Sequence, residues 1–121
     1  MALVLIVDDS PTEQHVFCKA LERSGHETVV ANDGEEAIET AIQAKPEVIV
    51  MDVVMPGMNG FQATRKLSKN PAPANIPVVM VSAKGQETDR IWGLRQGAAQ
   101  YLVKPVDAAQ LIAAVEAALA S

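Results

Sequence analysis

Short runs of branched aliphatic residues alternate along this chain with longer stretches in which apolar residues recur at helical spacing. The short runs are apolar at consecutive positions and are bounded by turn-forming residues, which is typical of strands buried on both faces of a parallel sheet. The pattern predicts strands at residues 3–7, 27–31, 47–51, 77–81 and 99–103. The intervening and final stretches predict helices at residues 11–24, 34–44, 59–69, 86–96 and 107–120.

Capping residues mark the ends of the predicted helices. Ser10 is followed by Pro11 and Glu13, which predicts an N-cap, a proline in the first turn and a capping-box glutamate. Asp33 and Asp107 are further N-cap candidates. Gly25 and Gly97 follow predicted helices and are suited to left-handed helix ends.

The regular alternation of strands and helices predicts βαβ units with right-handed crossovers, and therefore an α/β fold with a five-stranded parallel sheet. A length of 121 residues suits one domain, spanning 1–121, and we expect no output domain. The proline-rich segment 70–77 is interpreted as a connection within this domain, because two further strand–helix units follow it.

Composition narrows the class of protein. Hydrophobic residues make up 49% of the chain and aromatic residues only 3%, so the core should be aliphatic. The net charge of −5 argues against a nucleic-acid-binding surface, which requires a basic patch. The apolar runs are too short to span a bilayer, and the chain enters its first strand at Met1 without a signal segment, so we expect no membrane insertion.

The single cysteine, Cys18, cannot form an intramolecular disulfide, which favours a cytoplasmic location. Cys18 is expected to be an ordinary residue on the side of its helix. The positions expected to face inward on that helix are Val16, Phe17, Ala20 and Leu21.

Four of the apolar runs end in polar residues that suit phosphoryl chemistry. These residues are Asp8-Asp9, Asp52, Ser82 and Lys104-Pro105. The carboxyl ends of parallel strands form the ligand-binding edge of an open sheet, so we expect these side chains to converge there. Three neighbouring carboxylates repel one another by a few kcal/mol per pair, and a cation must compensate them.

Oxygen ligands without histidine or cysteine favour Mg²⁺, or the similar Mn²⁺, at this edge. Lys104 would add a point charge on a long stem, and the bond to Pro105 can be cis and fix a turn that directs the lysine inward. The plainer interpretation of Lys104 is a solvated lysine near a strand end, and that of Ser82 is a hydroxyl that happens to end a strand. The two histidines, His15 and His26, are expected to be solvated.

Taken together, these motifs resemble the receiver domain of two-component response regulators along the whole chain. The matching residues are Asp8-Asp9, Asp52, Met55-Pro56-Gly57-Met58-Asn59-Gly60, Ser82-Ala83 and Lys104-Pro105. Residues 9–13, 60–65 and 86–89 resemble, more narrowly, the single-domain regulators of twitching-motility chemosensory systems. The resemblance implies a doubly wound, flavodoxin-like sheet of order 2-1-3-4-5 flanked by five helices; the chemotaxis receiver is a standard example of this order.

The resemblance also implies a function. Asp52 would accept a phosphoryl group from a phosphohistidine of a sensor kinase, and the chain would catalyse only its own phosphorylation and dephosphorylation. Mg²⁺ would be bound by Asp9, Asp52 and the Val54 carbonyl, with Asp8 acting through water. The phosphorylated protein, expected to be a monomer, would signal by binding another protein or serve as a phosphate sink.

The remaining implied roles concern phosphate binding and output. Lys104, Ser82 and Ala83 would hold the phosphoryl oxygens, and Tyr101 would be the aromatic switch. Val54 and Lys84 occupy positions that would affect the phosphate lifetime. The output surface would include Arg90, Leu94, Ala98 and Tyr101.

Three alternatives remain on the sequence alone. An aspartyl-phosphate phosphohydrolase would need a second aspartate two residues after the nucleophile, where this chain has Val54. A flavodoxin-like cofactor binder would need a glycine- and hydroxyl-rich loop after the first strand, where Asp8 and Asp9 would repel a phosphate. The third alternative is a receiver-shaped interaction module that is never phosphorylated.

Overall fold

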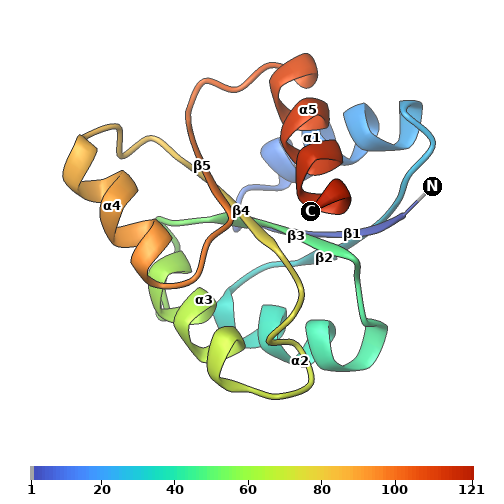
Figure 1. Ribbon diagram of the computed structural model, residues 1–121. Coiled ribbons are helices and arrows are strands. Elements are labelled where there is room, and N and C mark those ends of the chain that lie inside the picture. Colours follow the sequence, from blue (N-terminus) through green and yellow to red (C-terminus); the bar gives the residue numbers. More distant parts are fainter. Residues whose placement is uncertain (1) are drawn as a thin grey trace.

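Five parallel strands form one sheet with helices on both of its faces in the computed structural model, which describes residues 2–121 (Figure 1). The strand order is β2-β1-β3-β4-β5, and each neighbouring pair is parallel. The predicted doubly wound α/β fold and its strand order are therefore confirmed. Met1, from which the chain was expected to enter the first strand, lies outside the described residues.

All ten predicted elements are present, and their ends differ from the expected positions by at most one residue. The strands are β1 (Leu3–Val7), β2 (Glu27–Ala31), β3 (Val48–Asp52), β4 (Val78–Ser82) and β5 (Gln100–Val103). The helices are α1 (Pro11–Arg23), α2 (Gly34–Ala44), α3 (Gly60–Lys69), α4 (Glu87–Arg95) and α5 (Ala108–Ala120).

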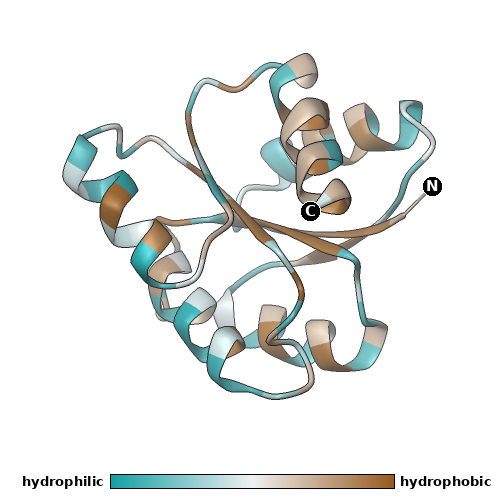
Figure 2. Cartoon of the chain, viewed as in Figure 1, coloured by the Kyte–Doolittle hydropathy of each residue, from teal (hydrophilic) through white to brown (hydrophobic). Residues whose placement is uncertain are grey.

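The central strands are buried on both faces, so alternate side chains enter two separate cores. On β1, Val4 and Ile6 pack toward α1 and α5, whereas Leu5 and Val7 pack toward α2 and α3. Figure 2 shows the apolar strands at the centre and hydrophilic residues on the outer sides of the helices. The core is aliphatic, as the composition indicated.

The helix boundaries follow the predicted caps. The side chains of Ser10, Asp33 and Asp107 each accept a hydrogen bond from the backbone N–H three residues later. Gly25 and Gly97 have φ values of 89° and 115°, in the left-handed region expected for them. No helix among residues 2–121 is both long and apolar enough to cross a bilayer.

Two burial predictions on the α1 side of the sheet are wrong. Val16 is 55% exposed, because the buried face of α1 is formed by Phe17, Ala20 and Leu21. His26 is only 7% exposed, because the turn into β2 places it beneath α5. Its Nδ1 accepts a hydrogen bond from the Ala2 N–H, and its Nε2 lies 3.3 Å from Glu116. The other predictions here agree with the structure: His15 is exposed, and Cys18 is a partly buried free thiol beside the core.

The start of α3 packs directly against the end of β3. The Gly60 N–H donates to the Val53 carbonyl at 2.8 Å. A Cβ at Gly60 would overlap the Asp52 carbonyl oxygen and lie 2.8 Å from the Val53 Cα. A side chain at this position would therefore displace the backbone that carries Asp52.

We predict that Gly60→Ala lowers the free energy of unfolding by about 3 kcal/mol, because the overlap is with backbone atoms that cannot turn aside. Gly57→Ala is the control, since Gly57 has a φ of 74° but open space around its Cβ position. It should cost about 1 kcal/mol, the strain of a left-handed alanine. Urea unfolding measures both, and equal losses would contradict the proposed overlap.

Candidate functional site

Three carboxylates converge at the carboxyl ends of β1 and β3. Asp8 and Asp9 follow β1, and Asp52 is the last residue of β3. Each offers an oxygen atom, and these atoms all lie within 4.8 Å of one another. Asp8 and Asp52 are buried and Asp9 is exposed, so the cluster is open to solvent on the Asp9 side.

Asp8 is the most deeply buried member of the cluster, with 1% of its surface exposed. Its Oδ1 accepts the Ser10 N–H at 2.9 Å, whereas its Oδ2 is buried with no hydrogen-bond partner among residues 2–121. Burial is the main reason that the pKa of Asp8 rises from 3.8 to about 6. The hydrogen bond from Ser10 lowers that pKa, and the charge of Asp52 raises it further.

Lys104 provides the positive charge of the site. Its Nζ lies 3.3 Å from Asp52 Oδ1 and 3.6 Å from Asp8 Oδ2. The Lys104–Pro105 peptide bond is cis, as expected, and the Lys104 N–H donates to the Ser82 carbonyl at 2.8 Å. The plainer interpretation of Lys104 as a solvated lysine is therefore wrong, since only 17% of its side chain is exposed.

Glu13 is a fourth acidic residue of the site, and sequence reasoning missed it. Its Oε2 lies 2.5 Å from Lys104 Nζ, a shorter contact than either aspartate makes. The predicted capping box is wrong in this respect: Ser10 Oγ accepts the Glu13 N–H, but the Ser10 N–H donates to Asp8. Side chains in the first turn of a helix point back toward its N-terminus, and this was the available signal, because the helix begins directly after Asp8-Asp9.

The pKa values of Lys104 and Asp52 reflect this crowding of charge. Burial lowers the pKa of Lys104, but the hydrogen bond to Glu13 and the charges of Asp52 and Asp8 raise it above its usual value. Burial raises the pKa of Asp52, while Lys104 lowers it and Glu13 raises it. One ammonium therefore compensates the buried carboxylates only in part.

The residues present fit a divalent cation. The carboxylate oxygens are hard ligands, and the buried Asp8 Oδ2 lacks a hydrogen-bond partner among the described residues. The exposed side of the cluster leaves room for the waters that Mg²⁺ retains in proteins.

Ser82, Lys84 and Tyr101 are linked beside the cluster. Ser82 is fully buried, and its Oγ accepts the Lys84 N–H at 3.1 Å. The Tyr101 hydroxyl donates to the carbonyl of the same Lys84 residue at 2.7 Å. Burial raises the pKa of the Tyr101 phenol. Ala83 is exposed, between the two linked residues.

The rim of the site also carries Val54, which is 58% exposed, and the exposed Lys84. Of the residues predicted to form the output surface, Arg90 is exposed and Leu94 is 37% exposed. Ala98 is 8% exposed, so its placement on that surface is wrong. The reason is the tight turn after α4, in which the Ala98 N–H donates to the Gly93 carbonyl and the methyl group enters the core.

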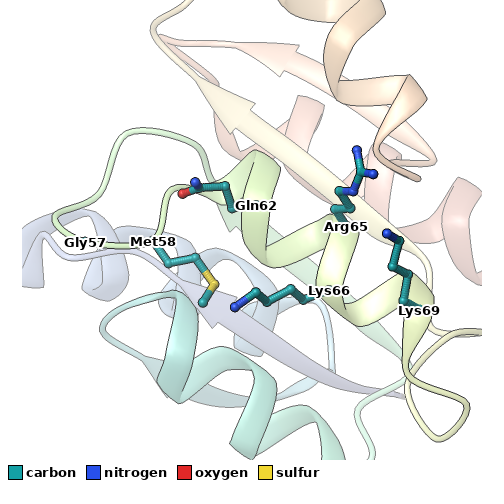
Figure 3. Close-up of a pocket in the computed structure, with 6 residues that line it drawn as sticks. All are labelled: Gly57, Met58, Gln62, Arg65, Lys66 and Lys69. Atoms are coloured by element: carbon teal, nitrogen blue, oxygen red, sulfur yellow. The ribbon is translucent and has the colours of Figure 1, made fainter.

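An open pocket of about 580 Å³ lies along α3, separate from the carboxylates. Figure 3 shows Arg65, Lys66 and Lys69 on α3, and Met58 in the segment before it. The lining includes no member of the cluster and not Lys104. The carboxylate cluster and Lys104 therefore lie outside this pocket.

The fold and the clustered carboxylates are those of a receiver domain, and the chain belongs to the response regulator receiver domain family, whose profile matches residues 4–116. Receiver domains are signalling modules and not classical enzymes. The described residues include no nucleic-acid-binding domain.

Protein PilH of Pseudomonas aeruginosa is 52% identical to this chain over 120 residues, which are 99% of each sequence. The chemotaxis protein CheY4 of Vibrio cholerae superposes with a TM-score of 0.92 at 32% identity, covering 98% of this chain and 99% of that one. The receiver domain of the sensor histidine kinase PA1611 of Pseudomonas aeruginosa was solved with a coordinated magnesium ion. It superposes with a TM-score of 0.91 at 28% identity, and the match covers 99% of this chain and 98% of that one. The predicted resemblance to chemotaxis-like receiver domains of response regulators is thus confirmed.

The raised pKa of Asp8 predicts a pH-dependent stability in chelator-containing buffer. The unfolded chain ionises Asp8 near its ordinary pKa of 3.8, whereas the native state keeps the proton up to about pH 6. The contribution of Asp8 to the free energy of unfolding should therefore fall as pH rises between these values, by roughly 3 kcal/mol.

Asp8→Asn removes this titration while keeping the acceptor for the Ser10 N–H. Its stability advantage over wild type should grow between about pH 4 and pH 7. Urea unfolding across this range is the measurement, and a pH-independent difference between the two proteins would contradict the assignment.

Proposed function

We propose that Asp52 accepts a phosphoryl group from the phosphohistidine of a sensor kinase. The observation that carries this proposal is the placement of Asp52 at the end of β3, beside two further carboxylates and 3.3 Å from the ammonium of Lys104. A buried carboxylate with a nearby cation is equipped to act as a nucleophile toward an anionic phosphoryl donor.

In the proposed transfer, a carboxylate oxygen of Asp52 bonds to phosphorus as the bond between phosphorus and the histidine nitrogen breaks, and the imidazole keeps the bonding electron pair. Lys104 and the Ser82 hydroxyl bind phosphoryl oxygens, with the Ala83 backbone beside them. A bound Mg²⁺ or Mn²⁺ supplies charge compensation, and Asp9, Asp52 and the Val54 carbonyl would hold it, with Asp8 acting through water. Catalysis in such a site is mainly positioning and electrostatics.

The alternatives are less well supported. A phosphohydrolase acting on external substrates lacks its general acid, because Val54 occupies that position and is apolar and exposed. A permanently unphosphorylated interaction module gives no role to the three clustered carboxylates, among which the buried Asp8 Oδ2 has no hydrogen-bond partner in the described residues. Hydrolysis of phosphorylated Asp52 itself would depend on the exposed rim residues Val54 and Lys84.

The geometry around Lys84 suggests how phosphorylation is read out. Movement of the Ser82 hydroxyl toward a phosphoryl oxygen would break its bond with the Lys84 N–H, and the Lys84 carbonyl is the acceptor of the Tyr101 hydroxyl. We therefore propose that phosphorylation shifts the population of Tyr101 orientations and reshapes the surface formed by Arg90, Leu94 and Tyr101.

We propose a monomeric, cytoplasmic receiver that signals by phosphorylation-dependent protein binding or acts as a phosphate sink. The 52% identity to PilH supports the receiver role on which this proposal rests. The sequence motifs shared with regulators of twitching motility support a role in that or a related motility system.

Phosphorylation is tested by intact mass after incubation with Mg²⁺ and a small phosphodonor. The mass of wild type should increase by that of one phosphoryl group. Asp52→Asn should show no increase, because its amide cannot replace the nucleophilic carboxylate. Excess chelator should also prevent the gain in wild type, and Asp9→Ala should reduce it. A full gain in Asp52→Asn would refute the assignment of Asp52.

The readout is tested with Trp92, which lies on α4 and is 48% exposed. Phosphodonor with Mg²⁺ should change its fluorescence in wild type but not in Asp52→Asn. Ser82→Ala should still be phosphorylated but lose much of the change, because the link from Ser82 to Lys84 is absent. Amide chemical shifts of residues 82–104 that stay constant on full phosphorylation would exclude the switch.

A further inference from the structure

The ammonium of Lys104 is held most closely by a residue outside the strand ends. Glu13, on the first turn of α1, lies 2.5 Å from Nζ, compared with 3.3 Å for Asp52. Among the influences that raise the pKa of Lys104, the hydrogen bond to Glu13 is the largest. The cation of the site is thus engaged mainly on the α1 side while Asp52 is unmodified.

No other role of the Glu13 side chain is evident among residues 2–121. The Ser10 N–H, which a capping-box glutamate would accept, donates to Asp8 instead. The bond from the Glu13 N–H to Ser10 uses only backbone atoms of Glu13. The carboxylate is therefore not needed to start α1, and its partner in the structure is Lys104.

We propose that Glu13 is a positioning residue for Lys104: it holds the ammonium beside α1 in the unmodified protein and competes with the phosphoryl oxygens for that ammonium once Asp52 is phosphorylated. This inference rests on the proposed phosphorylation of Asp52. A lysine ammonium has three donors on a flexible stem, so it can change partners without a backbone movement.

The proposal has two opposite electrostatic consequences. The charge of Glu13 adds to that of the aspartates and so favours binding of a divalent cation. The same charge repels a phosphoryl group and draws Lys104 away from it, and so disfavours the phosphorylated state. Removal of the charge should weaken one affinity and strengthen the other, which loss of a purely structural contact would not do.

The test uses Glu13→Gln, which keeps the length of the side chain and removes its charge. Mg²⁺ binding is followed by the amide chemical shifts of residues 8–10. Binding of beryllofluoride, a phosphoryl mimic, is then measured at saturating Mg²⁺. Relative to wild type, the dissociation constant for Mg²⁺ should rise about threefold and that for beryllofluoride should fall about threefold.

Glu47→Gln is the matched control. Glu47 is exposed and immediately precedes Val48, the first residue of β3, so the same charge is removed at the opposite edge of the sheet. Both affinities should stay at the wild-type value in this variant. Glu13→Ala provides a second removal of the charge and should shift both affinities in the same directions as Glu13→Gln.

The outcomes separate this inference from the proposed function. If wild type neither gains phosphoryl mass nor binds beryllofluoride, the proposed phosphorylation fails and the role of Glu13 fails with it. If wild type does both, but the Glu13 variants match it or change both affinities in one direction, only the positioning role is overturned. Equal shifts in Glu47→Gln would also overturn it, because net charge and not position would then be responsible.

Discussion

Compensation of buried carboxylates by the single ammonium of Lys104 is the interaction on which the site depends. Removing Asp8 and Asp52 from water is costly unless a cation and hydrogen bonds offset the loss of solvation. β4 lies between β3 and β5, so the lysine must extend past the end of β4 to reach Asp52. A long side chain at the end of β5 satisfies this requirement, and the parallel order of the strands brings it to the right edge.

Lys104 compensates the negative charge of the buried carboxylates only in part. The pKa values of Asp8 and Asp52 are both raised, so the native protein carries a cost for holding these groups ionised at neutral pH. A divalent cation at the carboxylates would relieve that cost. We therefore expect the folded chain to be less stable than an uncharged version of the same site, and the same carboxylates are of the type that binds hard cations.

The two sides of the site differ in how tightly their backbone is packed. Asp52 is fixed by β3 and by the close approach of Gly60, where no side chain fits. On the β5 side, α4 buries only Gly93, and a Cβ there would lie 2.8 Å from both the Met80 sulfur and the Tyr101 ring. A helix attached through one small residue has few apolar contacts to lose, which suits the movement proposed for the surface around Tyr101.

Sequence periodicity by itself determined the ten elements, because strands buried on both faces and capped helices have strong local patterns. It also determined that Asp8, Asp9, Asp52, Ser82 and Lys104 would share one edge, since this follows from parallel strands; the strand order itself came from family resemblance. Tertiary structure alone decided the partner of Glu13, the burial of His26 and Ala98, and the exposure of Val16. From local spacing, Glu13 could accept either the Ser10 N–H of a capping box or a distant cation. The packing of α1 against the strand ends brings residues 13 and 104 together, although they are far apart in the sequence, and so selects Lys104.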